Sequence, residues 1–116
     1  MSTSTLLPVI DVTACCAPLT RDILAAEQAV DLARSLKALA DPTRLRLISI
    51  VAASDEEEAC ACDLAEPTGL GQSTVSHHLK ILTDAGFFTR TQRGTWAYFK
   101  LVPGALDSVA RLLISA

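Results

Sequence analysis

Apolar positions recur at spacings of three and four through much of the chain, which is the period of a helix with one buried face. This pattern predicts a helix over about residues 20–40 and a second helix after Asp41-Pro42. Asp41 suits the cap of the second helix because its carboxylate accepts bonds from amides that have no helical partner, and Pro42 fits the first turn. The predicted buried stripes are Ala29, Leu32, Ala33, Leu36, Leu39 and Ala40 in the first helix, and Leu45, Ile48, Val51 and Ala52 in the second.

Turn residues interrupt the pattern in the middle of the chain. The acidic residues 54–58 predict a solvated loop. A short helix is expected to begin near Cys60 and to stop by Pro67, because a proline disfavours helical geometry in the residue before it. The next helix is predicted to open at Gln72-Ser73 with Ser73 as its N-cap, and Gly86 closes it as a left-handed residue.

The last third of the chain reads as two strands and a final helix. Aromatic and β-branched residues over 87–90 and 95–101 predict strands joined through Gln92-Arg93-Gly94 as a β-hairpin. After Pro103, apolar residues at helical spacing predict an amphipathic helix that pairs with the first helix in a dimer interface. The predicted fold is mainly α with a β-hairpin wing, in the order of a winged helix-turn-helix.

The helix that begins at Gln72-Ser73 has two distinct faces. Val75, Leu79 and Leu82 point inward, so at about 100° per residue the opposite face is polar. Its hydroxyls and His77 suit base edges and phosphates in a major groove, whereas His78 lies nearer the inner face. Arginines near the hairpin turn suit phosphate or minor-groove contact. The candidate DNA-binding residues are Gln72, Ser73, Thr74, Ser76, His77, Lys80, Arg90 and Arg93; the alternative interpretation is a solvated helix surface.

The formal net charge of −3 argues by itself against a nucleic-acid partner, because phosphate binding normally leaves a basic footprint. The charge is unevenly distributed, however. Residues 1–66 carry 11 acidic and 5 basic side chains, a net −6, whereas residues 67–116 carry 2 acidic and 5 basic, a net +3. A DNA-binding face is therefore expected in the second half, with binding that depends on salt and on dimerisation.

Length and composition limit the organisation of the chain. A chain of 116 residues, half of them hydrophobic, supports one domain with one core. Residues 1–19 are expected to form a flexible N-terminal arm, and residues 20–116 the winged helix-turn-helix and dimerisation domain. The terminal helices need a partner surface, which favours a symmetric homodimer. No apolar run reaches the length of a membrane span, so the expected location is the cytoplasm.

The four cysteines are expected to be ligands or redox groups, because cytosolic thiols are kept reduced. Soft sulfur selects thiophilic ions over Mg, Ca or Mn. Cys15 and Cys16 are adjacent in the arm, which makes a disulfide between them cramped. Cys60 and Cys62 do not share one helical face, so either one of them precedes the helix or one alone is a ligand. A cysteine that is simply a small buried hydrophobe is the plain alternative.

Two strings resemble the ArsR/SmtB family of metal-sensing repressors. They are Lys37-Ala38-Leu39-Ala40-Asp41-Pro42-Thr43-Arg44-Leu45-Arg46 and Gly71-Gln72-Ser73-Thr74-Val75-Ser76-His77-His78-Leu79-Lys80, and the resemblance covers about residues 30–101. It implies a homodimeric winged-helix repressor that binds double-stranded operator DNA without metal and releases it when an inducing ion binds. The same resemblance places operator contacts on Ser73, Thr74, Ser76 and His77.

The segment Cys60-Ala61-Cys62-Asp63-Leu64 resembles the Cys-Val-Cys-Asp-Leu box of the arsenic and cadmium/lead sensors in this family. Ala65 stands where the short arsenic-sensor version has a third cysteine, so the third thiolate must come from the arm. The predicted ligands are Cys15, Cys16 and Cys62, with Cys60 as a further candidate. The family's zinc site on the last helix uses Asp and His, and residues 103–116 contain Asp107 but no histidine.

The predicted function is that of an arsenite-responsive repressor that dissociates from its operator when As(III) binds cysteine thiolates, with no organic cofactor. Sb(III) is a further inducer to consider. A Cd(II)- or Pb(II)-responsive repressor is an alternative, as is a redox sensor that uses Cys60 and Cys62 or a disulfide from arm to helix. An enzyme is not expected, because the chain has no Ser-His-Asp set, phosphate-binding loop or histidine metal cluster.

Overall fold

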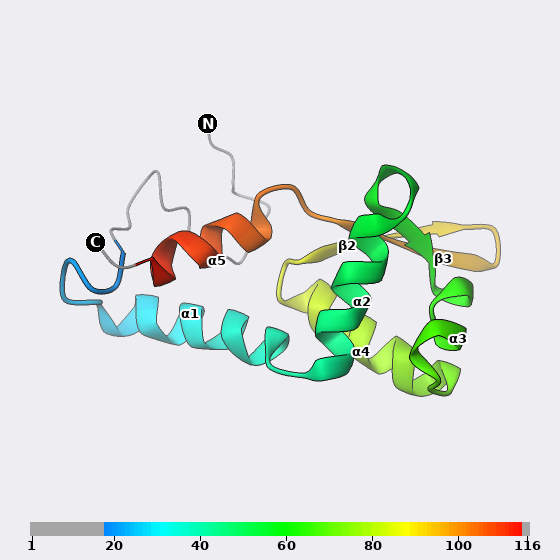
Figure 1. Cartoon of the computed structure of the whole chain (residues 1–116), viewed down its shortest axis with the longest axis horizontal. Helices are drawn as coiled ribbons and strands as arrows, with labels where there is room; N and C mark the ends of the chain where they lie inside the picture. Colours follow the sequence, from blue (N-terminus) through cyan, green and yellow to red (C-terminus); the bar gives the residue numbers. More distant parts are fainter. Residues whose placement is uncertain (1–17, 115–116) are drawn as a thin grey trace.

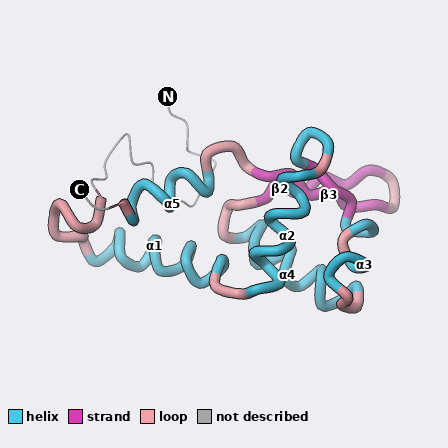
Figure 2. The backbone as a smooth tube through the Cα atoms, in the orientation of Figure 1, coloured by secondary structure: helices cyan, strands magenta, loops and turns pink. Residues whose placement is uncertain are grey.

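Helices dominate residues 18–114, which the computed structural model describes, and a small antiparallel sheet lies at one end of the molecule (Figures 1 and 2). The elements are α1 (Ala26–Leu39), α2 (Pro42–Ala53), η2 (Asp55–Glu57), β1 (Glu58–Cys60), η3 (Ala61–Asp63), α3 (Ala65–Thr68), α4 (Gln72–Asp84), β2 (Phe88–Arg93), β3 (Trp96–Leu101) and α5 (Ala105–Leu113). This order confirms the mainly helical fold with a hairpin wing. The arm cysteines Cys15 and Cys16 lie outside the described residues.

The junction between α1 and α2 forms as the sequence predicts. The Asp41 carboxylate accepts hydrogen bonds from the amides of Thr43 at 2.9 Å and Arg44 at 3.1 Å, and Pro42 occupies the first turn. α1 is shorter than predicted, because residues 20–25 form a turn and extended chain. The helix begins where the Gln28 side chain accepts a bond from the Ala25 amide.

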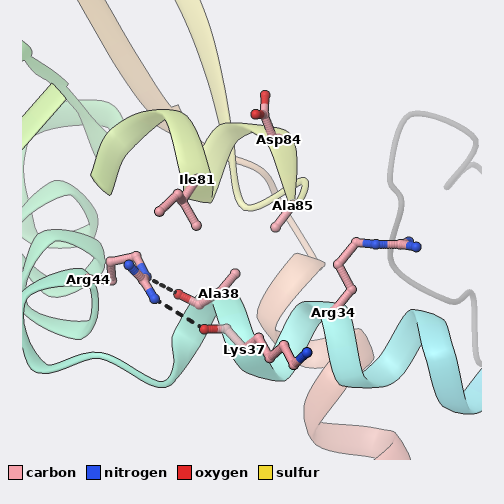
Figure 3. A pocket seen from close by; sticks show the side chains of 7 residues that line it. All are labelled: Arg34, Lys37, Ala38, Arg44, Ile81, Asp84 and Ala85. Carbon is pink, nitrogen blue, oxygen red and sulfur yellow. Dashed lines mark hydrogen bonds between the residues drawn. The ribbon is translucent and has the colours of Figure 1, made fainter. Parts of the chain in front are cut away.

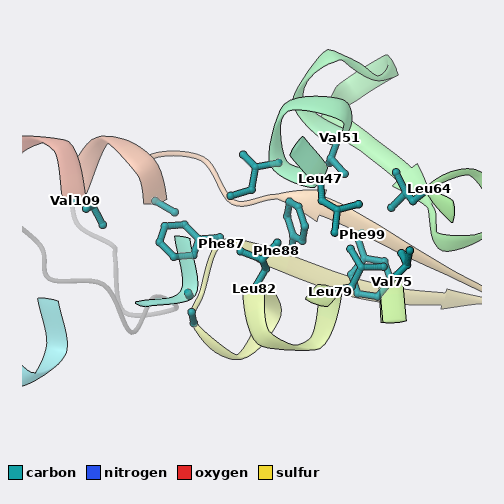
Figure 4. Packing of buried hydrophobic residues seen from close by; sticks show 14 of the residues in the cluster. Leu47, Val51, Leu64, Val75, Leu79, Leu82, Phe87, Phe88, Phe99 and Val109 are labelled. Carbon is teal, nitrogen blue, oxygen red and sulfur yellow. The ribbon is translucent and has the colours of Figure 1, made fainter. Parts of the chain in front are cut away.

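The core lies between α2, α4 and the sheet, and reaches toward α5 (Figure 4). In α2 the prediction for Leu45 is wrong: this side chain is 53% exposed, and Leu47 is fully buried instead. Ile48 and Val51 are buried as predicted, so the inward face of α2 is rotated away from Leu45 and toward Leu47. In α1 the buried stripe runs through Leu32, Ser35 and Ala38, with Leu36 and Leu39 half-buried. Three predicted members, Ala29, Ala33 and Ala40, are exposed in the single chain.

The sheet contains a strand that the sequence pattern did not reveal. β1 pairs antiparallel with the hairpin strand β3, and the strand order is β1-β3-β2. The predicted acidic loop is therefore the 3-10 turn η2 followed by the start of β1. The helix expected near Cys60 begins only at Ala65, and Pro67 lies inside it. A proline is tolerated there because the first turn of a helix needs no amide donor.

Helix α4 and the hairpin follow the prediction with shifted boundaries. Gly71, and not Ser73, is the N-cap, because its carbonyl accepts the first helical bond, from the Val75 amide at 3.1 Å. Gly86 ends the helix with φ 91°, as predicted. The strands turn at Gly94-Thr95, one residue beyond the predicted centre.

Helix α5 lies beside α1 at the end of the molecule opposite the wing (Figure 1). Val109 and Leu112 on α5 are buried in the core, and the Leu19 amide donates to the Leu112 carbonyl at 3.0 Å. Val30, Leu113 and Ile114, by contrast, are large apolar side chains that remain exposed on these terminal elements.

Candidate nucleic-acid interface and cysteine site

The outward face of α4 carries the predicted DNA-reading residues. Val75, Leu79 and Leu82 are buried as predicted, which fixes the rotation of the helix. The side chains left exposed on α4 are Gln72, Ser73, Thr74, Ser76, His77, Lys80 and Asp84. Lys80 forms an ion pair with Asp84 one turn later, with Nζ 3.0 Å from the carboxylate. The helix therefore presents hydroxyls, an imidazole and one cation on a single surface.

His78 has a different environment, and the sequence placed it correctly toward the inner face. Its Nδ1 accepts a hydrogen bond from the Arg44 guanidinium at 3.0 Å and lies 4.0 Å from the Asp41 carboxylate. The Arg44 amide that donates to Asp41, together with the charge of the Arg44 guanidinium, holds the pKa of the Asp41 carboxyl below its ordinary value despite partial burial. The start of α2 is thereby joined to α4.

Arg44 is a structural residue that the sequence analysis did not single out. Its guanidinium also donates to the carbonyl of Ala38 at 2.6 Å and of Lys37 at 3.2 Å, at the end of α1 (Figure 3). Periodicity could not reveal this role, because the contacts join three helices through one polar side chain. Arg44 sets the position of α4 relative to α1 and α2.

The wing residues are held by contacts within the sheet. The Arg90 guanidinium donates to the Gln92 side chain at 2.7 Å, and the Gln92 amide donates to the Gly94 carbonyl at 3.0 Å. The Arg93 guanidinium donates to the Glu58 carboxylate on β1 at 2.8 Å, and it lies 4.4 Å from the centre of the Tyr98 ring. Both arginines remain exposed.

A cleft of about 360 Å³ separates α4 from the wing. Ser76, Lys80 and Asp84 line it from the helix, Arg90 lines it from β2, and Phe99 lines it from β3. The two cations and the hydroxyl suit contact with a phosphate backbone, whereas the Asp84 carboxylate is already paired with Lys80. The cleft thus links the two parts of the predicted DNA-binding surface.

The cysteines of the described chain lie where the wing sheet meets the helix-turn-helix. Cys60 is the last residue of β1 and is 4% exposed, and Cys62 lies in η3 and is exposed. Both cysteines therefore precede α3, which begins at Ala65, whereas the sequence interpretation places at most one of them ahead of the helix. The Cys62 amide donates to the Cys60 sulfur at 3.2 Å, and both sulfurs and an Asp63 oxygen lie within 4.8 Å of one another.

Cys60 and Cys62 are joined by a disulfide, which differs from the expectation of reduced thiols. The bend from strand to 3-10 turn brings their Cα atoms to 5.1 Å, within the normal range for a disulfide. Reduction of this bond would supply two thiolates beside a carboxylate, a donor set that fits a soft ion.

The fold and the arrangement of α4, wing and cleft define a winged helix-turn-helix DNA-binding protein. Residues 41–89 match the family described as bacterial regulatory protein, arsR family. The arsenical resistance operon repressor of Bacillus subtilis (strain 168) is 41% identical over 68 residues, which are 59% of this chain and 63% of that protein. The putative arsenical resistance operon repressor ArsR2 of Halobacterium salinarum is 38% identical over 87 residues, 75% of this chain and 71% of the relative.

A solved structure shows the same fold. It is the homodimeric winged helix-turn-helix DNA-binding domain of a possible ArsR-family regulator from Mycobacterium bovis, with 29% identity, a TM-score of 0.59, and coverage of 79% of this chain and 82% of that one. The present chain belongs to the arsR family, whose members are DNA-binding transcriptional regulators and not enzymes. Within residues 18–114, no helix combines the length and apolar character that a bilayer crossing requires.

Proposed function

We propose that the protein is a homodimeric transcriptional repressor that leaves its operator when arsenite binds cysteine thiolates. The observation that carries the proposal is the position of Cys60 and Cys62. Together with the Asp63 carboxylate they stand at the junction of the wing and the helix-turn-helix, so ligand binding there acts on both DNA-contacting parts. Similarity to arsenical resistance repressors supports this reading.

Operator DNA is held by α4 in the major groove and by the wing beside it. Ser73, Thr74, Ser76 and His77 contact bases or phosphates, and Lys80 and Arg90 flank the phosphate backbone in the cleft. Gln72 and Arg93 complete this surface. Because few cations contribute per protomer, two protomers on an operator dyad are needed for firm binding.

The dimer uses the end of the molecule opposite the wing. Val30 on α1 and Leu113 and Ile114 at the end of α5 leave apolar surface exposed in one chain. A second copy would cover this surface through a two-fold contact. The similarity to a homodimeric winged-helix domain supports the same arrangement. The two copies then present their α4 helices to successive major grooves.

The inducer site is completed by the N-terminal arm. Arsenite takes three thiolates. Cys15 and Cys16 in the arm supply two of them, and Cys62, which is more exposed than Cys60, supplies the third. Cytoplasmic reductants would open the Cys60–Cys62 disulfide to free that thiolate, and Cys60 beside it is a further candidate ligand.

A gel-shift titration of the reduced protein on its operator tests this function. Arsenite is expected to release wild-type protein, whereas the Cys62→Ser variant and the Cys15→Ser/Cys16→Ser variant stay bound at the same concentration. An Ala59→Ser variant, which alters a neighbouring residue that has no thiol, serves as the matched control and should respond as wild type. Release of the double arm variant at wild-type arsenite would exclude the arm from sensing. Parallel titrations with Sb(III), Cd(II) and Pb(II) rank the alternative inducers.

The Cys60–Cys62 disulfide favours a second candidate, a repressor that responds to oxidation. A peroxide would take two thiols to the disulfide and would itself be reduced to water and an alcohol or a second water. Free-thiol counts measured alongside operator binding distinguish the two functions. Release that follows thiol loss without any added ion supports the redox candidate.

A further inference from the structure

The Arg93 side chain in the wing is hydrogen-bonded to β1, the strand that ends at Cys60. Its guanidinium donates to the Glu58 carboxylate at 2.8 Å and lies over the Tyr98 ring, 4.4 Å from its centre. The Glu58 side chain is 15% exposed and that of Arg93 is 51% exposed. The carboxylate is therefore fixed in the sheet, while the guanidinium lies at the surface.

The strand register explains why these groups meet. Cys60 is opposite Tyr98, and Glu58 is opposite Lys100, so Glu58 lies two residues before Cys60 on the same side of β1. On the other edge, Thr91 is opposite Tyr98, and Arg93 is opposite Trp96. Side chains two apart in a strand share a face, so Arg93 extends across the Tyr98 ring to reach Glu58.

β1 is the part of the wing that a change at the cysteines would move first. It is three residues long, lies at the edge of the sheet, and ends at Cys60. Because Cys60 is buried at the end of this strand, we expect a change of its sulfur partner to shift the strand end relative to β3. Such a shift would displace the Glu58 carboxylate and, with it, the Arg93 guanidinium near the hairpin turn.

We propose that Glu58 is a positioning residue that couples the state of the cysteine site to the grip of the wing on DNA through Arg93. The inference rests on the proposed function. It adds a second way for ion binding to lower operator affinity, beside any movement of α4. Glu58 does not contact DNA in this scheme. It sets where the Arg93 guanidinium meets a phosphate, and the cysteines control Glu58.

The test measures operator affinity with and without arsenite for reduced wild type, Glu58→Gln, Arg93→Gln and the double variant. The quantity of interest is the ratio of the two affinities, because a purely structural loss would change both alike. In Glu58→Gln the arsenite-induced loss of affinity should shrink by about 1.5-fold to fivefold, the range that one partly exposed ion pair can contribute. The double variant should match Arg93→Gln, since Glu58 acts through Arg93.

Glu57→Gln is the matched control. It removes the same negative charge one residue earlier, from an exposed side chain that forms no ion pair within residues 18–114. Its ratio of operator affinity without and with arsenite should equal that of wild type. This result would separate the effect of losing the Glu58–Arg93 contact from the effect of losing one negative charge. Thiolate-to-arsenic absorbance in the ultraviolet should remain in Glu58→Gln, because the cysteines are unchanged.

The fluorescence of Trp96 reports a structural change in the wing independently of DNA binding. It is the single tryptophan in the chain, it is 52% exposed, and it is opposite Arg93. Its fluorescence should change when arsenite binds wild-type protein and should change less in Glu58→Gln. An equal arsenite ratio and an equal fluorescence change in both proteins would overturn the inference alone. Wild-type protein that keeps its operator in arsenite would overturn the proposed function and this inference together.

Discussion

Arg44 joins three helices, and its replacement by methionine is the sharpest stability test that the structure offers. The guanidinium donates to the carbonyls of Ala38 and Lys37 at the end of α1, and it also donates to His78 on α4. Methionine keeps most of the aliphatic stem and removes the charge and all the donors. The variant therefore isolates the polar contacts from the packing.

The expected cost follows from the contacts one by one. The 2.6 Å bond to Ala38 is partly buried and has a charged donor, which is worth about 1.5–3 kcal/mol. The bond to Lys37 is exposed and adds a few tenths of a kcal/mol, and the partly buried bond to His78 adds about 0.5–1.5 kcal/mol. Loss of a cation at the end of α1 costs about 0.3–1 kcal/mol. The sum is about 2.5–6 kcal/mol, which corresponds to a fall of about 10–25 °C in Tm for a domain of this size.

Urea unfolding followed by circular dichroism, at one fixed protein concentration, measures this cost. Arg46→Met on the same helix is the control, because Arg46 is exposed and forms no ion pair in the described part of the chain. It should change the free energy of unfolding by about 0.5 kcal/mol at most. If Arg44→Met is no less stable than Arg46→Met, the three-helix role of Arg44 is wrong.

Three further predictions concern α4 and its neighbours. Leu79→Ala should destabilise the protein by about 2–5 kcal/mol in the same urea assay, because the side chain is fully buried; a cost below that of the exposed His77→Ala would contradict the core assignment. Gly86→Ala should cost about 1–2 kcal/mol, because φ is 91° there, and an unchanged urea midpoint would count against the left-handed cap. The lowered pKa of Asp41 means that its charge stabilises the fold above the ordinary carboxyl range, and that this contribution disappears as pH falls through the folded-state pKa. Wild type should therefore exceed Asp41→Asn in stability at neutral pH and lose that advantage below about pH 4, and a constant difference across that range would refute the linkage.

Features set by local chemistry could be predicted from the sequence. Asp41 caps α2 through amides two and three residues away, and Gly86 ends α4 by its own backbone freedom. The outward, polar face of α4 was predictable because Val75, Leu79 and Leu82 recur at helical spacing and are all buried. Each of these features depends on residues within one turn or one helix, so the local sequence pattern is sufficient to predict it.

Features set by distant partners could not be predicted. β1 is a strand because β3 supplies its hydrogen bonds from about forty positions away, and its acidic start gives no strand pattern. The buried face of α2 depends on which side meets α4, and two equally apolar choices, Leu45 and Leu47, lie on opposite sides. Arg44 and Arg93 contact residues in other helices and strands, and the spacing of apolar residues along one element carries no information about such contacts.

The structure also shows how the acidic side chains affect the candidate DNA-binding surface, which the net charge alone does not reveal. Lys80 is paired with Asp84, and Arg93 with Glu58, so two of the candidate DNA-binding cations already hold carboxylates. Each carboxylate offsets part of the positive charge that a phosphate would meet, so the electrostatic gain on DNA binding is smaller than for unpaired cations. A protein built this way binds DNA less tightly than its cations alone suggest. Because Glu58 lies on the strand that ends at Cys60 and holds the Arg93 guanidinium in position, a small change in the geometry of the cysteine site alters how that guanidinium meets a phosphate.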